Sequence, residues 1–158
     1  MTKLDRIDFE ILQALQKNAR ISNKELAAII GLAPSSCHER LKRLNSEGVF
    51  RGVHLDVDPA LLGYDLKAIL MMEVAHESHD VDQFMSEVED IPEVIDIALI
   101  TGRYDLIVHV VVRDTNHLKN LAMAKFSNRP EIKRLETSII YESRRTYHLP
   151  MIEEAAPA

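Results

Sequence analysis

The chain has 158 residues, of which 46% are hydrophobic and 28% are charged, and this composition excludes a disordered or fibrous protein. No stretch approaches the about 18 consecutive apolar residues that a transmembrane helix needs, and the N-terminus has no apolar signal region. We therefore expect a cytoplasmic protein with no membrane partner. The formal net charge is −6, and the acidic excess lies in residues 59–158, because residues 1–58 carry nine Lys and Arg against eight Asp and Glu.

The first expected helix runs from Asp5 to Lys17. Asp5 is a residue type that caps helix N-termini. Apolar residues follow the helical period at Leu4, Ile7, Ile11 and Leu15.

Residues 22–47 predict two further helices joined at a sharp turn. Ser22 and Glu25 have the spacing of a capping box, in which the hydroxyl and the carboxylate each accept a hydrogen bond from an otherwise unpaired backbone N–H. Gly31 can end this helix in a left-handed conformation, and Pro34 suits the start of the next helix, where its missing N–H is not needed. The pattern is that of a helix-turn-helix.

The last of these helices has one apolar and one polar face. Cys37, Leu41 and Leu44 share a stripe at about 100° per residue, so we expect the lone cysteine to pack in the core. The polar face has hydroxyls first and cations later, an order that suits base contacts at the helix start and phosphate contacts beyond. The candidate DNA-binding residues are Ser35, Ser36, His38, Glu39, Arg40, Lys42 and Arg43. The alternative is an ordinary helical hairpin with a solvated charged face.

The remaining elements follow a weakly alternating segment, residues 49–58, which we expect to be a strand or an extended hinge. Their expected order is strand 66–75, helix 80–91, strands 94–101 and 105–113, a helix capped by Thr115, and strand 132–141. This βαββαβ order is typical of a ferredoxin-like fold, in which two helices cover one face of an antiparallel sheet.

Both faces of the first strand in this sheet are largely apolar. One face carries Leu66, Ala68, Leu70, Met72 and Val74, and the other carries Ile69, Met71 and Ala75. Two helices can cover only one face, so the other needs a partner, and a second copy of the chain is the commonest solution. The alternative is that residues 142–158 fold back over the sheet.

Three stretches of sequence together carry a resemblance to a known family. They are LDRIDFEILQALQKNARISNKELAAIIGLAPSSCHERLKRLNSEGVFRG, VDPALLGY and TGRYDLIVHVVVRD. The chain resembles the Lrp/AsnC, or feast/famine, family of transcriptional regulators. That resemblance implies binding to double-stranded DNA, dimerisation through the sheet, frequent assembly into octamers, and regulation by amino acids bound between subunits.

The resemblance and the patterns give one domain assignment. We predict an α+β protein with a three-helix, winged helix-turn-helix domain in residues 1–50, a β hinge in 51–64, a ferredoxin-like effector-binding and oligomerisation domain in 65–145, and a tail in 146–158. One departure from the family is Ala33, where Ser commonly precedes the proline. Without that hydroxyl the recognition helix lacks its usual cap, which leaves backbone N–H groups available to a DNA phosphate.

The segment Thr101–Asp105 is expected to be a hairpin turn, with Gly102 in a positive-φ conformation. It also has the chemistry to bind an amino acid, because a backbone N–H near Gly102 can approach a carboxylate closely and Asp105 can pair with an ammonium group. The resemblance adds Thr137 and Ser138 to the same cleft. The candidate effector-binding residues are Thr101, Gly102, Arg103, Tyr104, Asp105, Thr137 and Ser138.

No metal, cofactor or catalytic site is expected. The cluster His76–Asp80, with Asp82 nearby, has metal-binding residue types, but its loose spacing favours a solvated loop that ends in a helix cap. No nucleophile with an adjacent base and no phosphate-binding loop can be placed. A metabolite-sensing module that controls an enzyme partner, and an enzyme of ferredoxin-like fold, remain the alternatives to a DNA-binding regulator.

Overall fold

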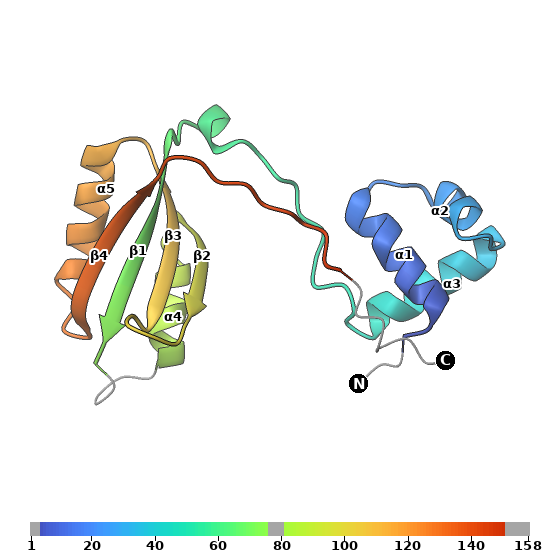
Figure 1. Cartoon of the computed structure of the whole chain (residues 1–158), viewed down its shortest axis with the longest axis horizontal. Coiled ribbons are helices and arrows are strands. Elements are labelled where there is room, and N and C mark those ends of the chain that lie inside the picture. The colour runs from blue at the N-terminus through green and yellow to red at the C-terminus, as the bar shows by residue number, and fades with distance from the viewer. Residues whose placement is uncertain (1–3, 76–80, 151–158) are drawn as a thin grey trace. The chain divides into compact units, whose positions relative to one another are not determined.

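A computed structural model of the chain describes residues 4–75 and 81–150. The chain forms two compact units: residues 56–143 are one, and the N-terminal 55 residues together with the segment from Arg144 onwards are the other. Figure 1 labels the helices and strands of both units.

The first unit contains three helices, α1 (Arg6–Lys17), α2 (Asn23–Ile29) and α3 (Pro34–Ser46). The predicted capping box of Ser22 at the start of α2 is confirmed. Asp5 caps α1 as predicted, and Asp8 completes a second capping box there, which the sequence analysis did not predict. These reciprocal bonds satisfy backbone N–H groups that have no partner within the helix.

The turn between α2 and α3 also has the predicted backbone. Gly31 has a φ of 69°, in the left-handed region, and Pro34 is the first residue of α3. The helices enclose a small core of fully buried residues, namely Ile11, Leu26, Ala27, Cys37 and Leu44. Cys37 is therefore a core residue, as predicted, and burial raises the pKa of its thiol.

The segment 49–58 is extended but forms no strand in the single chain. Val53, Leu55 and Val57 alternate along it and are exposed. The short 3₁₀ helix Pro59–Leu62 follows and is capped by Asp58, whose side chain accepts a hydrogen bond from Ala60 N. The role of this segment as a hinge stays a prediction.

The second unit has the predicted βαββαβ order. Its elements are β1 (Leu66–Val74), α4 (Val81–Glu89), β2 (Val94–Leu99), β3 (Leu106–Val112), α5 (Thr115–Leu121) and β4 (Ile132–Ile140). The strands pair antiparallel in the order β2-β3-β1-β4, which confirms the ferredoxin-like arrangement. Both helices lie on the same side of the sheet (Figure 1) and share one core with it, in which Leu70, Val88 and Leu121 are buried.

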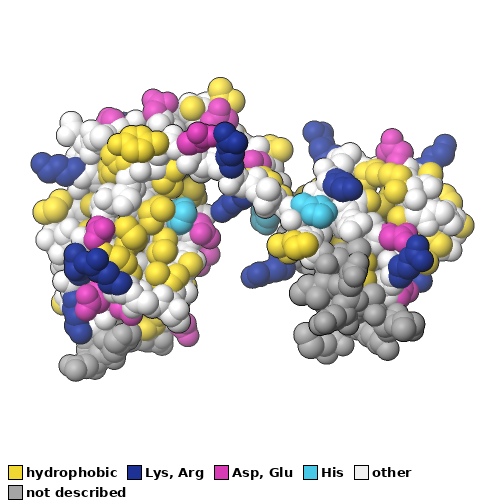
Figure 2. Space-filling view, viewed as in Figure 1, with side chains coloured by type: hydrophobic (Ala, Val, Ile, Leu, Met, Phe, Trp, Pro, Cys, Tyr) yellow, Lys and Arg dark blue, Asp and Glu magenta, His cyan; other side chains and the backbone are white. Residues whose placement is uncertain are grey.

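The other face of the sheet is open in the single chain, and it is mixed: Ile69, Met71 and Ile107 are apolar, whereas Arg134 and Glu136 on β4 are charged. On β1 the side chains alternate between buried positions, such as Leu70 and Met72, and half-buried positions, such as Ile69 and Met71. The strand register places Ile107 beside Met71 on this open face. Figure 2 shows hydrophobic side chains gathered on the sheet of this unit, with charged groups around them.

One local prediction in this unit was wrong, and one feature was not predicted. The cap of α5 is Asp114, whose side chain accepts a hydrogen bond from His117 N, and Thr115 is the first helical residue. A carboxylate is as good a cap as a hydroxyl, so two adjacent candidates could not be ranked from sequence. The chain also continues beyond α5 as a π-helical turn, Ala122–Ser127, which brings Phe126 fully into the core.

Candidate DNA-binding helix and ligand turn

The polar face of α3 consists of two groups of side chains. Five of the predicted residues are exposed, namely Ser35, Ser36, His38, Glu39 and Lys42. The N-cap residue Ala33 makes no side-chain hydrogen bond, so the first turn of α3 has the uncapped N–H groups that the sequence predicted. This end of the helix has the positive pole of the helix dipole, which favours an anion.

A side chain that the sequence analysis missed holds the start of α3. The Asn23 amide, in the first turn of α2, donates a hydrogen bond of 2.8 Å to the carbonyl of Pro34. The backbone N–H of Leu32 also donates to the carbonyl of Ala27 at 2.9 Å. These two bonds fix how α3 leaves the turn. No local pattern identifies Asn23, because its partner lies in the next helix.

The other two predicted residues, Arg40 and Arg43, form ion pairs with α1. Arg40 Nη1 lies 2.6 Å from Asp5 Oδ2 and 2.9 Å from Asp8 Oδ1, and Arg43 Nη2 lies 2.6 Å from Asp8 Oδ2. Asp8 is completely buried, whereas the side chains of Arg40 and Arg43 are 29% and 38% exposed. Arg43 also lies 3.7 Å from Glu47. The structure therefore gives both arginines partners within the protein.

These contacts shift the pKa values of the groups that make them. The hydrogen bond to Asp5 raises the pKa of Arg40, and the hydrogen bond to Asp8 raises that of Arg43. Burial is the largest single influence on Asp5 and would raise its pKa, but the hydrogen bond and charge of Arg40, together with backbone hydrogen bonds from Asp8 and Ile7, outweigh burial and lower that pKa. All three groups are charged near neutral pH.

The predicted hairpin turn joins β2 to β3. Ile100 N donates to the carbonyl of Asp105 at 2.8 Å and closes the turn, and Gly102 has a φ of 123°. Thr101, Gly102 and Arg103 are exposed. A side chain at Gly102 would meet no neighbouring atom, so the constraint at this position is the backbone conformation.

Asp105 has a structural bond that the sequence analysis did not predict. Its Oδ2 accepts a hydrogen bond of 2.8 Å from the backbone N–H of Val74, and its own N–H donates to the carbonyl of Met72 at 2.9 Å. Asp105 thus fastens the turn to the end of β1. At least one oxygen of this carboxylate is already engaged in the absence of a ligand.

Tyr104 connects the turn to β4. Its hydroxyl donates to the carboxylate of Glu136, which lies 3.7 Å from the guanidinium of Arg134, and this hydrogen bond raises the pKa of Tyr104. The guanidinium of Arg103 lies 5.4 Å from the centre of the Tyr104 ring, within cation–π range. Neither Arg134 nor Glu136 was predicted from the sequence to lie near this turn. Only the strand register, which places Glu136 beside Met71 on the open face, brings them to the turn.

The register also separates two residues that were predicted to line one cleft. Thr137 pairs with Leu70 and Ser138 pairs with Ile69, so they lie on opposite faces of the sheet. Neighbouring residues in a strand always alternate in this way. Ser138 shares the open face with Glu136, whereas Thr137 lies on the helix-covered side at the edge of the sheet.

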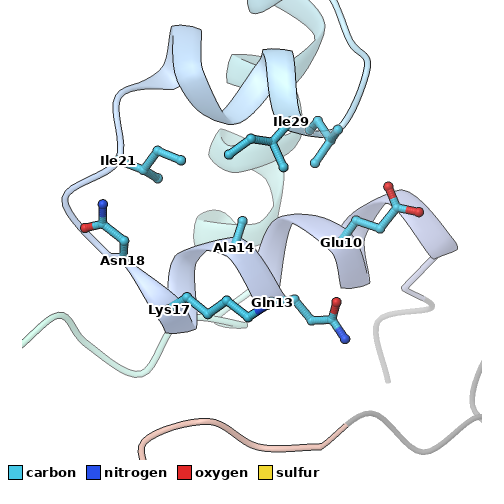
Figure 3. A pocket seen from close by; sticks show the side chains of 8 residues that line it. Glu10, Gln13, Ala14, Lys17, Asn18, Ile21 and Ile29 are labelled. Atoms are coloured by element: carbon cyan, nitrogen blue, oxygen red, sulfur yellow. The ribbon is translucent and has the colours of Figure 1, made fainter.

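Three further findings bear on the kind of site present. Within residues 4–75 and 81–150 no group of three or more His, Cys, Asp and Glu side chains is arranged to hold a metal ion, and the cluster His76–Asp80 lies outside the described residues. None of the helices in this part of the chain is long and apolar enough to span a membrane. A groove of about 580 Å³ lies between α1 and α2 in the first unit, where Ile21 and Ile29 lie opposite Ala14 (Figure 3).

Comparison with known proteins agrees with both units. The winged helix-turn-helix DNA-binding family matches residues 4–51, and the Lrp/AsnC ligand-binding domain matches residues 67–148. The chain belongs to the Lrp/AsnC family. It is therefore a transcriptional regulator with a DNA-binding domain and a ligand-binding domain.

Two relatives span nearly the whole of this Lrp/AsnC regulator. It is 36% identical to the HTH-type transcriptional regulator AldR of Mycolicibacterium smegmatis over 143 residues, which cover 90% of this chain and 84% of the relative. It is 29% identical to the regulatory protein AsnC of Escherichia coli, over 89% of this chain and 91% of the relative.

Two solved structures resemble the Lrp/AsnC regulator closely. A transcriptional regulator of Neisseria meningitidis in complex with L-Met has a TM-score of 0.87 at 27% identity and covers 93% of this chain and 96% of its own. A feast or famine regulatory protein of M. tuberculosis complexed with L-methionine has a TM-score of 0.79 at 27% identity, with coverage of 89% and 93%.

Proposed function

We propose that this regulator reads double-stranded DNA through the exposed face of α3, with Ser35, Ser36 and Glu39 near base edges. His38 lies beside them, and Lys42 meets the phosphate backbone. The observation that carries the proposal is the order of groups along an exposed helix face, with short polar side chains over an uncapped first turn and a lysine further on. Side chains near the start of a recognition helix reach bases, whereas cations beyond them meet phosphates.

The test is a titration of duplex DNA at several salt concentrations. Lys42→Ala should lower affinity for all sequences alike and flatten the dependence of log K on log salt by about 0.9. Lys119→Ala removes the same charge from an exposed position on α5 and serves as the matched control. An unchanged slope in Lys42→Ala would exclude the proposed contact between Lys42 and a phosphate. If the wild-type protein binds no DNA, an interaction module that controls an enzyme partner is favoured. If the protein steadily turns over a metabolite, an enzyme is favoured.

We further propose that the turn around Gly102 binds an amino acid. The N–H groups near this exposed glycine can approach a carboxylate, and Glu136, which accepts from Tyr104, is available to an ammonium group. Both carboxylates already accept a hydrogen bond, Glu136 from the Tyr104 hydroxyl and Asp105 from the backbone N–H of Val74. Glu136 suits this role better, because the Tyr104 side chain can turn away, whereas the Val74 N–H is fixed in the backbone. The two structural neighbours described with L-Met or L-methionine support an amino-acid ligand.

The effector proposal is tested by thermal shift with each of the twenty amino acids, since a ligand that binds only the native state raises its apparent stability. Glu136→Gln should abolish the shift from the best ligand and leave affinity for DNA without ligand unchanged. Lys133→Gln, at an exposed position of the same strand, is the control. A full response in Glu136→Gln would contradict the assignment of this carboxylate.

The open face of the sheet supports a proposal about assembly. We propose that two copies pair through this face and that the dimers assemble further into an octamer in the cytoplasm, where they reach chromosomal DNA. The apolar side chains on this face are stabilised when they are buried against a second copy. The effector then acts by favouring one arrangement of subunits over another, which needs a coupling free energy of only about 1–3 kcal/mol.

A further inference from the structure

The carboxylate of Asp8, on α1, forms ion pairs with the proposed DNA-binding helix α3. Asp8 is fully buried, and three donors converge on it: the backbone N–H of Asp5 at 3.0 Å, Arg40 Nη1 at 2.9 Å and Arg43 Nη2 at 2.6 Å. A buried carboxylate is stable only when charged or hydrogen-bonding partners compensate for the water it has lost. Two of its three partners come from α3.

The positions of the two arginines make this contact directional. Arg40 and Arg43 are three residues apart, so they lie on the same side of α3, one turn above the other. Both guanidinium groups reach the same carboxylate, and Arg40 bonds Asp5 as well at 2.6 Å. Two directed ion pairs from successive turns therefore resist a rotation of α3 about its own axis, in addition to the packing of the core.

The arginines also border the exposed face. Glu39 and Lys42 are exposed, and each precedes one of the paired arginines in the sequence. A rotation of α3 would therefore carry the exposed side chains away from the bases. If either arginine left Asp8 for a phosphate, the buried carboxylate would lose a compensating charge, so the protein contact opposes that exchange.

We propose that Asp8 is a positioning residue for DNA recognition: its buried carboxylate holds Arg40 and Arg43 and thereby sets the rotation of α3, and both arginines keep this contact when DNA is bound. The inference rests on the proposed DNA-binding function of α3. It differs from the expectation for a solvated polar face, in which Arg40 and Arg43 contact DNA themselves. Asp8 then controls sequence discrimination without touching DNA.

The test compares specific with non-specific binding. The probes are a duplex selected from a random-sequence library by the wild-type protein and a scrambled duplex of the same composition. Asp8→Asn keeps the size of the side chain but removes its charge, and it should lower affinity for the selected duplex at least tenfold, with little change for the scrambled one. Glu47→Gln is the matched control, because it removes an exposed carboxylate that also faces Arg43. It should leave the ratio of the two affinities unchanged.

A second pair of variants keeps the test decisive if Asp8→Asn unfolds. Arg43→Lys retains the charge but loses the fork that binds two acceptors, so it should also lose discrimination. Arg43→Ala should lower affinity for the selected duplex without flattening the salt dependence, whereas loss of a phosphate contact would flatten it by about 0.9. All titrations are run at a temperature where circular dichroism gives the wild-type helical signal.

Two results would overturn the inference. One is an Asp8→Asn variant that discriminates like the wild type, and the other is a flattened salt slope in Arg43→Ala. Lys42→Ala separates this failure from failure of the proposed function. If Lys42→Ala flattens the slope while Asp8→Asn discriminates normally, α3 binds DNA without positioning by Asp8. If Lys42→Ala leaves the slope unchanged, the proposed phosphate contact is wrong, and if the wild-type protein selects no duplex at all, the proposed reading of DNA by α3 is wrong.

Discussion

Substitution of Asp105 distinguishes a structural role from a ligand-binding role at the turn. The Asp105 carboxylate accepts a hydrogen bond of 2.8 Å from the backbone N–H of Val74, a residue that is only 3% exposed. In Asp105→Ala that N–H has no partner, and an unsatisfied buried donor costs about 1–3 kcal/mol. In Asp105→Asn the side-chain amide oxygen can still accept the bond, so most of the stability should remain.

This difference is large enough to measure by thermal unfolding. A loss of 1 kcal/mol lowers the midpoint by about 4–8 °C in a domain of about 60–100 residues, so Asp105→Ala should unfold at least about 4 °C below the wild type. Asp105→Asn should fall by less than half of that amount. The assay is circular dichroism at the transition of the unit formed by residues 56–143.

The same two variants test the ligand role through their response to the amino acid found by thermal shift. If Asp105 is purely structural, Asp105→Asn keeps that response, whereas an ion pair with the ammonium group would make Asp105→Asn lose affinity about tenfold or more. An Asp105→Ala variant that unfolds at the wild-type temperature would refute the structural reasoning, because the bond to Val74 would then contribute nothing.

Three further predictions follow from other features of the fold. Ile69→Asp places a charge on the open face of the sheet and should convert dimers to monomers in sedimentation velocity, and a stable wild-type monomer at low micromolar concentration would contradict that role. Gly102→Val forces a β-branched side chain into a φ of 123°, so it should lower both the unfolding temperature and the affinity for the effector, while Gly102→Asn should be milder. The pKa of Asp5 is lowered in the folded state, so its contribution is present above the ordinary Asp pKa of 3.8 and is lost as pH falls below it. Asp5→Asn should therefore lower the unfolding temperature at pH 7 but not near pH 2, and equal losses at both pH values would exclude the ion pair as the cause.

The features that could be predicted from sequence are those determined by close neighbours along the chain. The capping box of Ser22 and Glu25, the left-handed Gly31 and the Pro34 helix start each depend on residues within about four positions, where spacing alone specifies the contact. The order of strands and helices along the second unit was likewise predictable, because each strand and helix has its own hydrophobic period. The alternation along β1 then indicated that one face of the sheet would lack a cover.

The missed features join residues that are far apart in sequence. Arg43 and Asp8 are separated by 35 positions, and Tyr104 and Glu136 by 32, so no local period relates them. From the sequence, Arg43 had the pattern of a solvated cation, because helical spacing shows only which face a side chain is on and not which helix passes beside it. Glu136 required the register of β4 against β1, which hydrophobic alternation alone does not determine.

The ion pairs of α3 have a consequence for engineering this protein. Positions 40 and 43 are tied to a buried acid on another helix, so a change at either one requires a compensating change at Asp8. Ser35, Ser36, His38, Glu39 and Lys42 make no such contact with α1 and can be randomised independently. Under the proposed role of α3, a library restricted to these five positions would vary the DNA sequence that is read while the helical scaffold stays the same. Retargeting the regulator to a chosen promoter would then be a search over one face of a single helix.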